Sequence, residues 1–146
     1  MAGLLGWVAF SVLVVLGDLL IPNRSWWTSL GLFGTPITGV NNFNTPTMDV
    51  GPVLVGVVVA LVLFVLLGVG LVYYMPLFRR LRLHPLIGGV VYGVLVWLVL
   101  GLALLNPLAG GRFNLITLLI ADVVAGAVMA WWLAGRPAQA APPASA

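Results

Sequence analysis

Four long apolar runs dominate the chain, and short polar segments separate them. The runs are residues 3–21, 52–75, 86–106 and 113–134. At 1.5 Å per residue, each is long enough for an α-helix to cross a hydrocarbon core of ~30 Å. Their unbroken apolarity favours helices in lipid over the buried strands that valine-rich runs form in soluble proteins. The pattern predicts an all-α membrane protein, an up-down bundle of four transmembrane helices within one domain, residues 1–136.

The segments outside the runs contain mostly turn-forming and small residues. Residues 23–51 form a long connection rich in Gly, Pro, Asn and Thr, and Trp26 and Trp27 in it suit a membrane interface. We expect a loop that lies on the end of the bundle, and a functional or partner-bound loop is the alternative. Residues 137–146 are rich in Ala and Pro, and they are expected to form a disordered tail.

The first apolar run has a second interpretation, a signal peptide. No positively charged segment precedes it, and Pro22, Asn23 and Arg24 follow it in place of a small-residue cleavage site. These flanks favour a retained helix.

Composition supports lipid as the solvent and removes several kinds of chemistry. The chain has 146 residues, of which 62% are hydrophobic and 6% charged. Soluble domains carry about a quarter charged residues. There is no Cys, Lys or Glu and a single His. No P-loop, dinucleotide turn, HExxH motif or Ser–His–acid set is present. We therefore expect no catalytic constellation, no cofactor and no metal site, and the net charge of +3 is too scattered for nucleic acid.

The polar turn at residues 75–85 sets the predicted orientation. It contains Arg79, Arg80, Arg82 and His84. Short basic loops stay in the cytoplasm, so both termini should be cytoplasmic in a bacterial inner membrane. The three arginines are also candidates to bind anionic lipid headgroups. Of the six arginines, this topology places residues 79, 80, 82 and 136 inside and residues 24 and 112 outside.

Small residues in the last two runs predict how those helices pack. Lipid gives helices no hydrophobic reason to associate, so close backbone approach at small residues matters. We expect the third and fourth helices to form an antiparallel hairpin. The candidate packing residues are Gly89, Gly93, Gly101, Ala121, Ala125 and Gly126.

Asp122 is the best candidate for chemistry. It lies ~14 Å into the fourth run, near the bilayer midplane, where an acid costs about 2.5–3.5 kcal/mol on insertion scales. Trp97 falls at nearly the same predicted depth, so we hypothesise that its indole N–H, or a partner protein, hydrogen-bonds Asp122. The site would then be a proton or cation site, or an interhelical hydrogen bond with a structural role. For Asp18, near the end of the first run, we expect a surface or interfacial ion pair with Arg24 or Arg112.

Two classes of function fit these observations. The first is a small structural or accessory subunit that associates with itself or with a larger membrane complex. The alternative is a proton- or cation-coupled transporter or channel, a homo-oligomer around Asp122. The size and four-span layout are similar to those of small multidrug-resistance-type transporters. That family has an essential Glu near the middle of the first span, which the position of Asp18 does not match. A membrane-embedded enzyme is the third class and has the least support.

Overall fold

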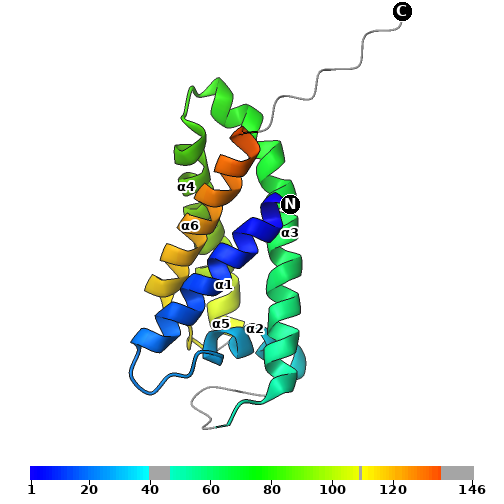
Figure 1. The fold of residues 1–146 in the computed structure, drawn as a ribbon, viewed down its shortest axis with the longest axis vertical. Coiled ribbons are helices and arrows are strands. Elements are labelled where there is room, and N and C mark those ends of the chain that lie inside the picture. Colours follow the sequence, from blue (N-terminus) through cyan, green and yellow to red (C-terminus); the bar gives the residue numbers. More distant parts are fainter. Residues whose placement is uncertain (40–46, 109, 136–146) are drawn as a thin grey trace, which may run out of the picture.

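A four-helix bundle forms the body of the protein. The computed structural model describes residues 1–39, 47–108 and 110–135, and every regular element in these ranges is helical. Three of the bundle helices are α1 (Ala2–Leu20), α3 (Val50–Arg80) and α6 (Leu115–Ala134). The fourth is continuous over α4 (Pro85–Val96), η1 (Trp97–Leu105) and α5 (Asn106–Leu108). The helices run alternately down and up (Figure 1), which confirms the predicted bundle.

All four bundle helices are long and apolar enough to cross a membrane, and they indicate a multi-pass membrane protein in contact with lipid. Residue 1 and the end of α6 lie toward the same end of the bundle (Figure 1). The predicted disordered tail and Arg136 lie outside the described residues.

Helix α3 extends further than the apolar run predicts. It continues through Pro76 to Arg80 and changes direction near this end (Figure 1), as expected where a proline removes a backbone donor. The helix ends in two backbone hydrogen bonds, Leu83 N–H to Phe78 O at 3.0 Å and Arg82 N–H to Arg79 O at 3.1 Å. This is a Schellman motif, and Arg82, with φ +55°, occupies the left-handed position where glycine is usual.

The bundle helix that runs from α4 to α5 contains a π-helical segment that the sequence does not predict. Over the nine residues of η1 the hydrogen bonds span five residues, as in the bond from Asn106 N–H to Gly101 O. π-Helical turns are rare and occur frequently at functional sites. Within η1, Gly101 is the buried residue.

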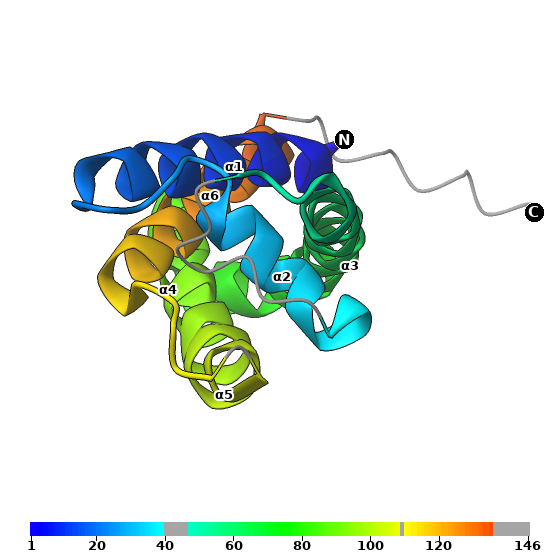
Figure 2. The ribbon, with the colours of Figure 1, turned by 90° about the horizontal axis from the view of Figure 1, so that it is seen from below.

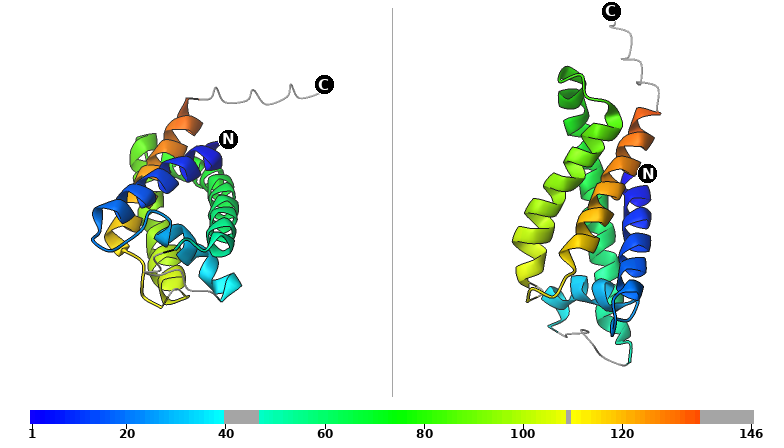
Figure 3. Two further views of the ribbon diagram at one scale, coloured as in Figure 1. Left: turned by 60° about the horizontal axis from the view of Figure 1, so that its bottom comes forward. Right: turned by 90° about the vertical axis from the view of Figure 1, so that its left-hand side faces the viewer.

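The sequence predicted an irregular loop between the first two spans. The structure instead has a buried helix in this connection. Helix α2 (Thr28–Thr38) lies across one end of the bundle (Figures 1 and 2), and a side view agrees (Figure 3). All residues from 28 to 34 are buried. The predicted place of the segment, on the end of the bundle, is correct. Its helical structure depends on tertiary contacts, and helix propensities of single residues take no account of these contacts.

Glycines allow three pairs of helices to approach closely. A Cβ atom on Gly68 of α3 would lie 2.7 Å from the Gly3 nitrogen of α1. On α4, Gly89 and Gly93 lie against the backbone of α6, and a Cβ on Gly89 would be 2.5 Å from the Gly126 carbonyl oxygen. Between α2 and α3, a Cβ on Gly34 would be 3.0 Å from the Gly56 nitrogen. None of these positions has room for a side chain.

An aromatic cluster packs between α2 and the bundle helices. Phe10 of α1 lies 4.7 Å from Phe64 of α3 and 5.7 Å from Phe33 of α2, measured between ring centroids. Phe33 continues the chain of contacts to Phe113, at 5.0 Å, just before α6. The four rings are buried and join α2 to three other parts of the fold. Aromatic pairs of this kind each contribute about 0.5–1.5 kcal/mol beyond their buried area.

We predict that Gly93→Ala lowers the free energy of unfolding by about 1–3 kcal/mol, the usual range for overpacking. The new methyl group would meet the carbonyl oxygen of Asp122, and backbone cannot move aside as a side chain can. Titration with sodium dodecyl sulfate in mixed micelles, followed by circular dichroism, measures this change. Gly51→Ala is the matched control, because its Cβ would make only an ordinary contact of 3.5 Å. Equal stability of the two variants would contradict the close packing of α4 on α6.

Candidate functional site

Asp122 lies inside the bundle, on the face of α6 that turns away from lipid. Only 7% of the residue is exposed, and the neighbouring Ala121 and Ala125 are fully buried. The start of α6 is fixed by the side chain of Asn114, whose Oδ1 accepts hydrogen bonds from the backbone N–H groups of Ile116 at 3.1 Å and Thr117 at 3.4 Å. Within the described ranges, no hydrogen bond or ion pair joins the Asp122 carboxyl group to another residue.

A small cavity lies beside the Asp122 carboxyl group. Its volume is about 20 Å³, which is enough for roughly one water molecule. Asp122 contributes the polar side chain of the lining, and the other lining residues are apolar. They come from α1, α2, α3, α4 and η1, and include Phe10, Phe33, Phe64, Leu100 and Leu105. Asp122 therefore borders a water-sized space in an otherwise apolar interior.

The hypothesis that Trp97 hydrogen-bonds Asp122 is wrong. The indole N–H of Trp97 donates to the backbone carbonyl of Leu115 at 3.0 Å, and an indole has only one donor. Leu115 lies seven residues before Asp122, about two turns of helix away. Gly93 and Gly101, four residues to either side of Trp97, both lie close to Asp122, so the error lies in the direction of the indole ring and not in the depth.

Gly101 takes the position beside Asp122 that was predicted for Trp97. A Cβ on Gly101 would lie 3.8 Å from Asp122 Oδ2 and 3.2 Å from a ring carbon of Trp97. Gly101 was proposed from the sequence as a packing residue for the last helix. In the structure it brings the backbone of η1 close to the carboxyl group.

The other predicted packing residues divide between two neighbours of α6. Gly89 and Gly93 of α4 face Gly126 and the backbone of Asp122. Ala121 and Ala125 continue, at four-residue spacing, the row that begins at Thr117 and ends at Met129. Thr117 contacts Gly17 of α1, and Met129 contacts Gly6. The small residues of α6 thus allow two helices, α1 and α4, to pack against it.

Asp18 forms a buried cluster at the opposite end of α1 from residue 1. It accepts a hydrogen bond from Arg24 Nη1 at 3.3 Å, so the predicted ion pair is confirmed. The prediction of a surface pair is wrong, because α2 covers Asp18 and leaves it 1% exposed. Ser29 donates its backbone N–H to Asp18 Oδ2 at 2.7 Å and its hydroxyl to Oδ1 at 2.8 Å. Arg24 also donates to the carbonyl oxygen of Arg112, before α6.

Ser29 was not identified from the sequence, because no local pattern links it to Asp18. It lies in the first turn of α2, where unpaired backbone N–H groups and the helix dipole favour an anion. Asp18 therefore caps α2 from another helix.

The basic turn lies at the other end of the bundle. Arg79 and Arg80 occupy the last turn of α3, where the helix dipole favours cations, and both are exposed, as is Arg82. His84 caps α4, with its Nδ1 atom accepting the N–H of Leu86 at 3.4 Å. In the described part of the chain, no three His, Cys, Asp or Glu residues are grouped so that they could hold a metal ion.

Comparison with models of protein families, with curated proteins and with solved structures found no significant match.

We predict that Asp18→Ala lowers the free energy of unfolding by about 3–5 kcal/mol, because it removes one partner of a buried ion pair. Ser29→Ala, which removes one hydrogen bond to a charged group, should cost about 1.5–3 kcal/mol. Hydrogen exchange should accelerate first in the amides of α2. Asp49→Ala is the control for loss of an acid, since exposed Asp49 caps α3 through Gly51 N–H. If α2 exchanges at the wild-type rate in Asp18→Ala, the cluster does not hold this helix.

Proposed function

We propose that this protein is a proton-coupled transporter or channel of the bacterial inner membrane, with Asp122 as its proton-binding residue. The observation that supports the proposal is the buried carboxyl group of Asp122, without a partner in the described residues and beside a cavity of about 20 Å³. An ionisable residue inside a membrane bundle is expensive, and such residues typically mark proton relays or ion pathways.

A purely structural role for Asp122 has less support. An acid that joins helices does so through a hydrogen bond to a neighbouring helix. Beside the Asp122 carboxyl group, η1 places the backbone around Gly101 at van der Waals distance. The indole N–H of Trp97 donates to Leu115 instead. Burial of this acid costs free energy, and no hydrogen bond among the described residues offsets that cost.

The chemistry of the cavity favours a proton over a metal cation. Hard cations such as Ca²⁺ require about six oxygen ligands, and Mg²⁺ keeps several waters. The cavity beside Asp122 presents one carboxyl group among apolar walls. A proton needs only that group and a water molecule to carry it away. The Oδ1 atom of Asn106, which follows Leu105 of the cavity wall, is also buried without a partner in the described chain.

The π-helical segment supplies a part that could move. Asp122 lies next to η1, and π-helical turns are frequent at functional sites. The cavity is lined by residues of a single chain, so the proposed site does not require the homo-oligomer of the sequence-based hypothesis. With the basic turn in the cytoplasm, α2 covers the outer end of the bundle.

We predict that the infrared band of protonated carboxyl groups in lipid vesicles contains a pH-dependent component that Asp122→Asn removes. The substitution keeps the shape of the side chain but cannot bind and release a proton. Asp49→Asn, at an exposed position, should lose only the component of its own carboxyl group and should keep the Asp122 component and wild-type proton uptake. With an imposed membrane potential, proton uptake into vesicles should fall to the level of empty vesicles in Asp122→Asn. Wild-type spectra and uptake in that variant would overturn the proposal.

The second candidate function is a structural or accessory subunit that associates with itself or with a larger membrane complex. A specific observation favours it: a groove of about 390 Å³ between α4 and α6 is lined only by apolar residues, among them Val90, Val124 and Trp131. The glycine contacts and α2, in contrast, are used within the bundle and leave less for a partner.

Mild detergent extraction, followed by mass spectrometry of the proteins that migrate with the chain, distinguishes the two candidates. A transporter should migrate alone or with copies of itself. A fixed set of larger partners would favour the accessory subunit and turn the apolar groove between α4 and α6 into the expected contact surface.

A further inference from the structure

A second hollow, far from Asp122, combines apolar walls with one cation. It lies between the last part of α3 and the end of α6 and has a volume of about 250 Å³. Val72, Met75, Pro76 and Leu133 provide apolar walls, and Arg79 contributes a guanidinium group. An exposed arginine beside an apolar hollow suits a ligand with a charged head and a hydrocarbon tail.

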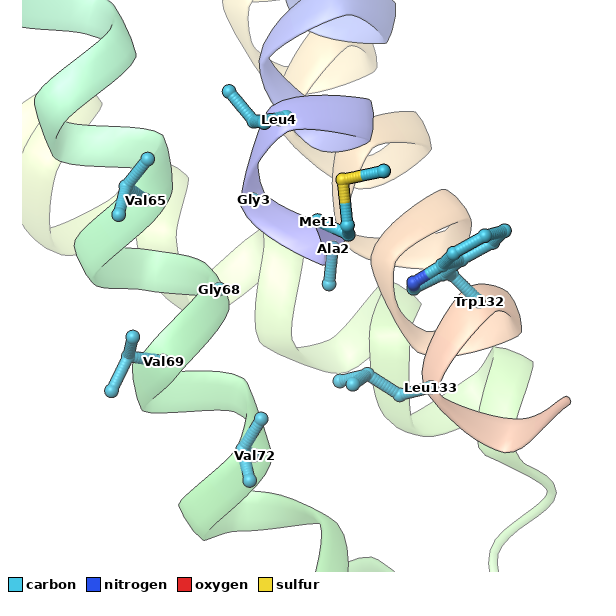
Figure 4. A pocket seen from close by; sticks show the side chains of 10 residues that line it. All are labelled: Met1, Ala2, Gly3, Leu4, Val65, Gly68, Val69, Val72, Trp132 and Leu133. Carbon is cyan, nitrogen blue, oxygen red and sulfur yellow. The ribbon is translucent and has the colours of Figure 1, made fainter. Parts of the chain in front are cut away.

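The apolar surface continues from this hollow along α3, away from the basic turn. Figure 4 shows a neighbouring hollow of about 210 Å³, which shares Val72 and Leu133 with the first. Its wall on α3 reaches back to Val65. From Arg79 to Val65 the helix rises ~21 Å, compared with ~15 Å for the hydrocarbon of one leaflet. The apolar surface between Arg79 and Val65 is therefore long enough for one acyl chain that lies parallel to α3.

We propose that the two hollows form one groove along α3 that binds a single anionic phospholipid. Its phosphate lies at Arg79, and one acyl chain runs along Val72 toward Val65. A guanidinium group can bind a phosphate through two parallel hydrogen bonds. Arg80 and Arg82 add positive charge within the same turn, although only Arg79 lines the hollow. The backbone of Arg82 has φ +55°, where glycine would be less strained, so this position carries a cationic side chain despite the strain.

The proposal is independent of the function of Asp122, which lies nearer the middle of α6. It also differs from a general attraction between basic residues and an anionic membrane. General attraction depends on the number of charges, so Arg79 and Arg80 would contribute equally. A defined site depends on which arginine lines the groove.

Native mass spectrometry of the purified full chain in detergent tests this difference. The chain is titrated with dioleoyl phosphatidylglycerol and, separately, with dioleoyl phosphatidylcholine. We expect the first phosphatidylglycerol to bind more tightly than phosphatidylcholine. Arg79→Gln should weaken that first binding about tenfold or more, the factor for loss of a hydrogen bond to a charged group. Arg80→Gln, with the same net charge, should stay close to wild type.

A second pair of variants tests the groove without a change in charge. Val72→Phe fills the wall shared by the two hollows and should weaken phosphatidylglycerol binding while all arginines remain. Val62→Phe is the control, since Val62 is also exposed on α3 but lines neither hollow. Equal losses in Arg79→Gln and Arg80→Gln, no effect of Val72→Phe, or no preference for phosphatidylglycerol would each overturn the site.

Discussion

Close contact between helix backbones at glycine is the constraint on which this structure depends. In lipid, apolar side chains gain little by leaving their solvent, so helices hold together through close packing. Gly3 meets Gly68, Gly34 meets Gly56, and Gly89 meets Gly126. These three contacts join α1 to α3, α2 to α3 and α4 to α6. They set the distances at which everything else in the bundle is arranged, including the narrow space around Asp122.

The two buried aspartates have opposite environments, and α2 connects them. The carboxylate of Asp18 accepts hydrogen bonds from Ser29 and Arg24, and it holds the first turn of α2. Further along α2, Phe33 forms part of the wall of the cavity beside Asp122. Asp18, whose carboxylate has hydrogen-bond partners, thus fixes α2. This helix in turn closes the space around Asp122, whose carboxyl group has no partner among the described residues. Under the proposed function, Asp122 is the proton-binding residue.

Much of the architecture could be predicted from the sequence, because a long apolar run in lipid satisfies its backbone hydrogen bonds by forming a helix. The pair of Asp18 with Arg24 followed from their proximity in the chain. Helix α2 could not be predicted, since its Gly, Thr and Pro residues favour turns and its stability comes from Asp18 and from contact with α3. No residue pattern indicated the π-helical segment, and depth along a span does not reveal the direction in which the Trp97 indole points. Nothing in the sequence indicated that Gly3 meets α3 or that Gly6 and Gly17 meet α6.

The capping of α2 by Asp18 also has a consequence for the order of assembly during synthesis. Asp18 and Ser29 are 11 residues apart, so this contact closes a short loop. Closure of a short loop costs little conformational entropy. The hairpin of α4 and α6 is likewise made of neighbours in the chain. In contrast, α1 meets α6 through Gly6 and Met129, which are separated by most of the polypeptide. We expect α1 with α2 to form one early unit and α4 with α6 another. The joining of α1 to α6 then completes the protein only after the last span has left the ribosome.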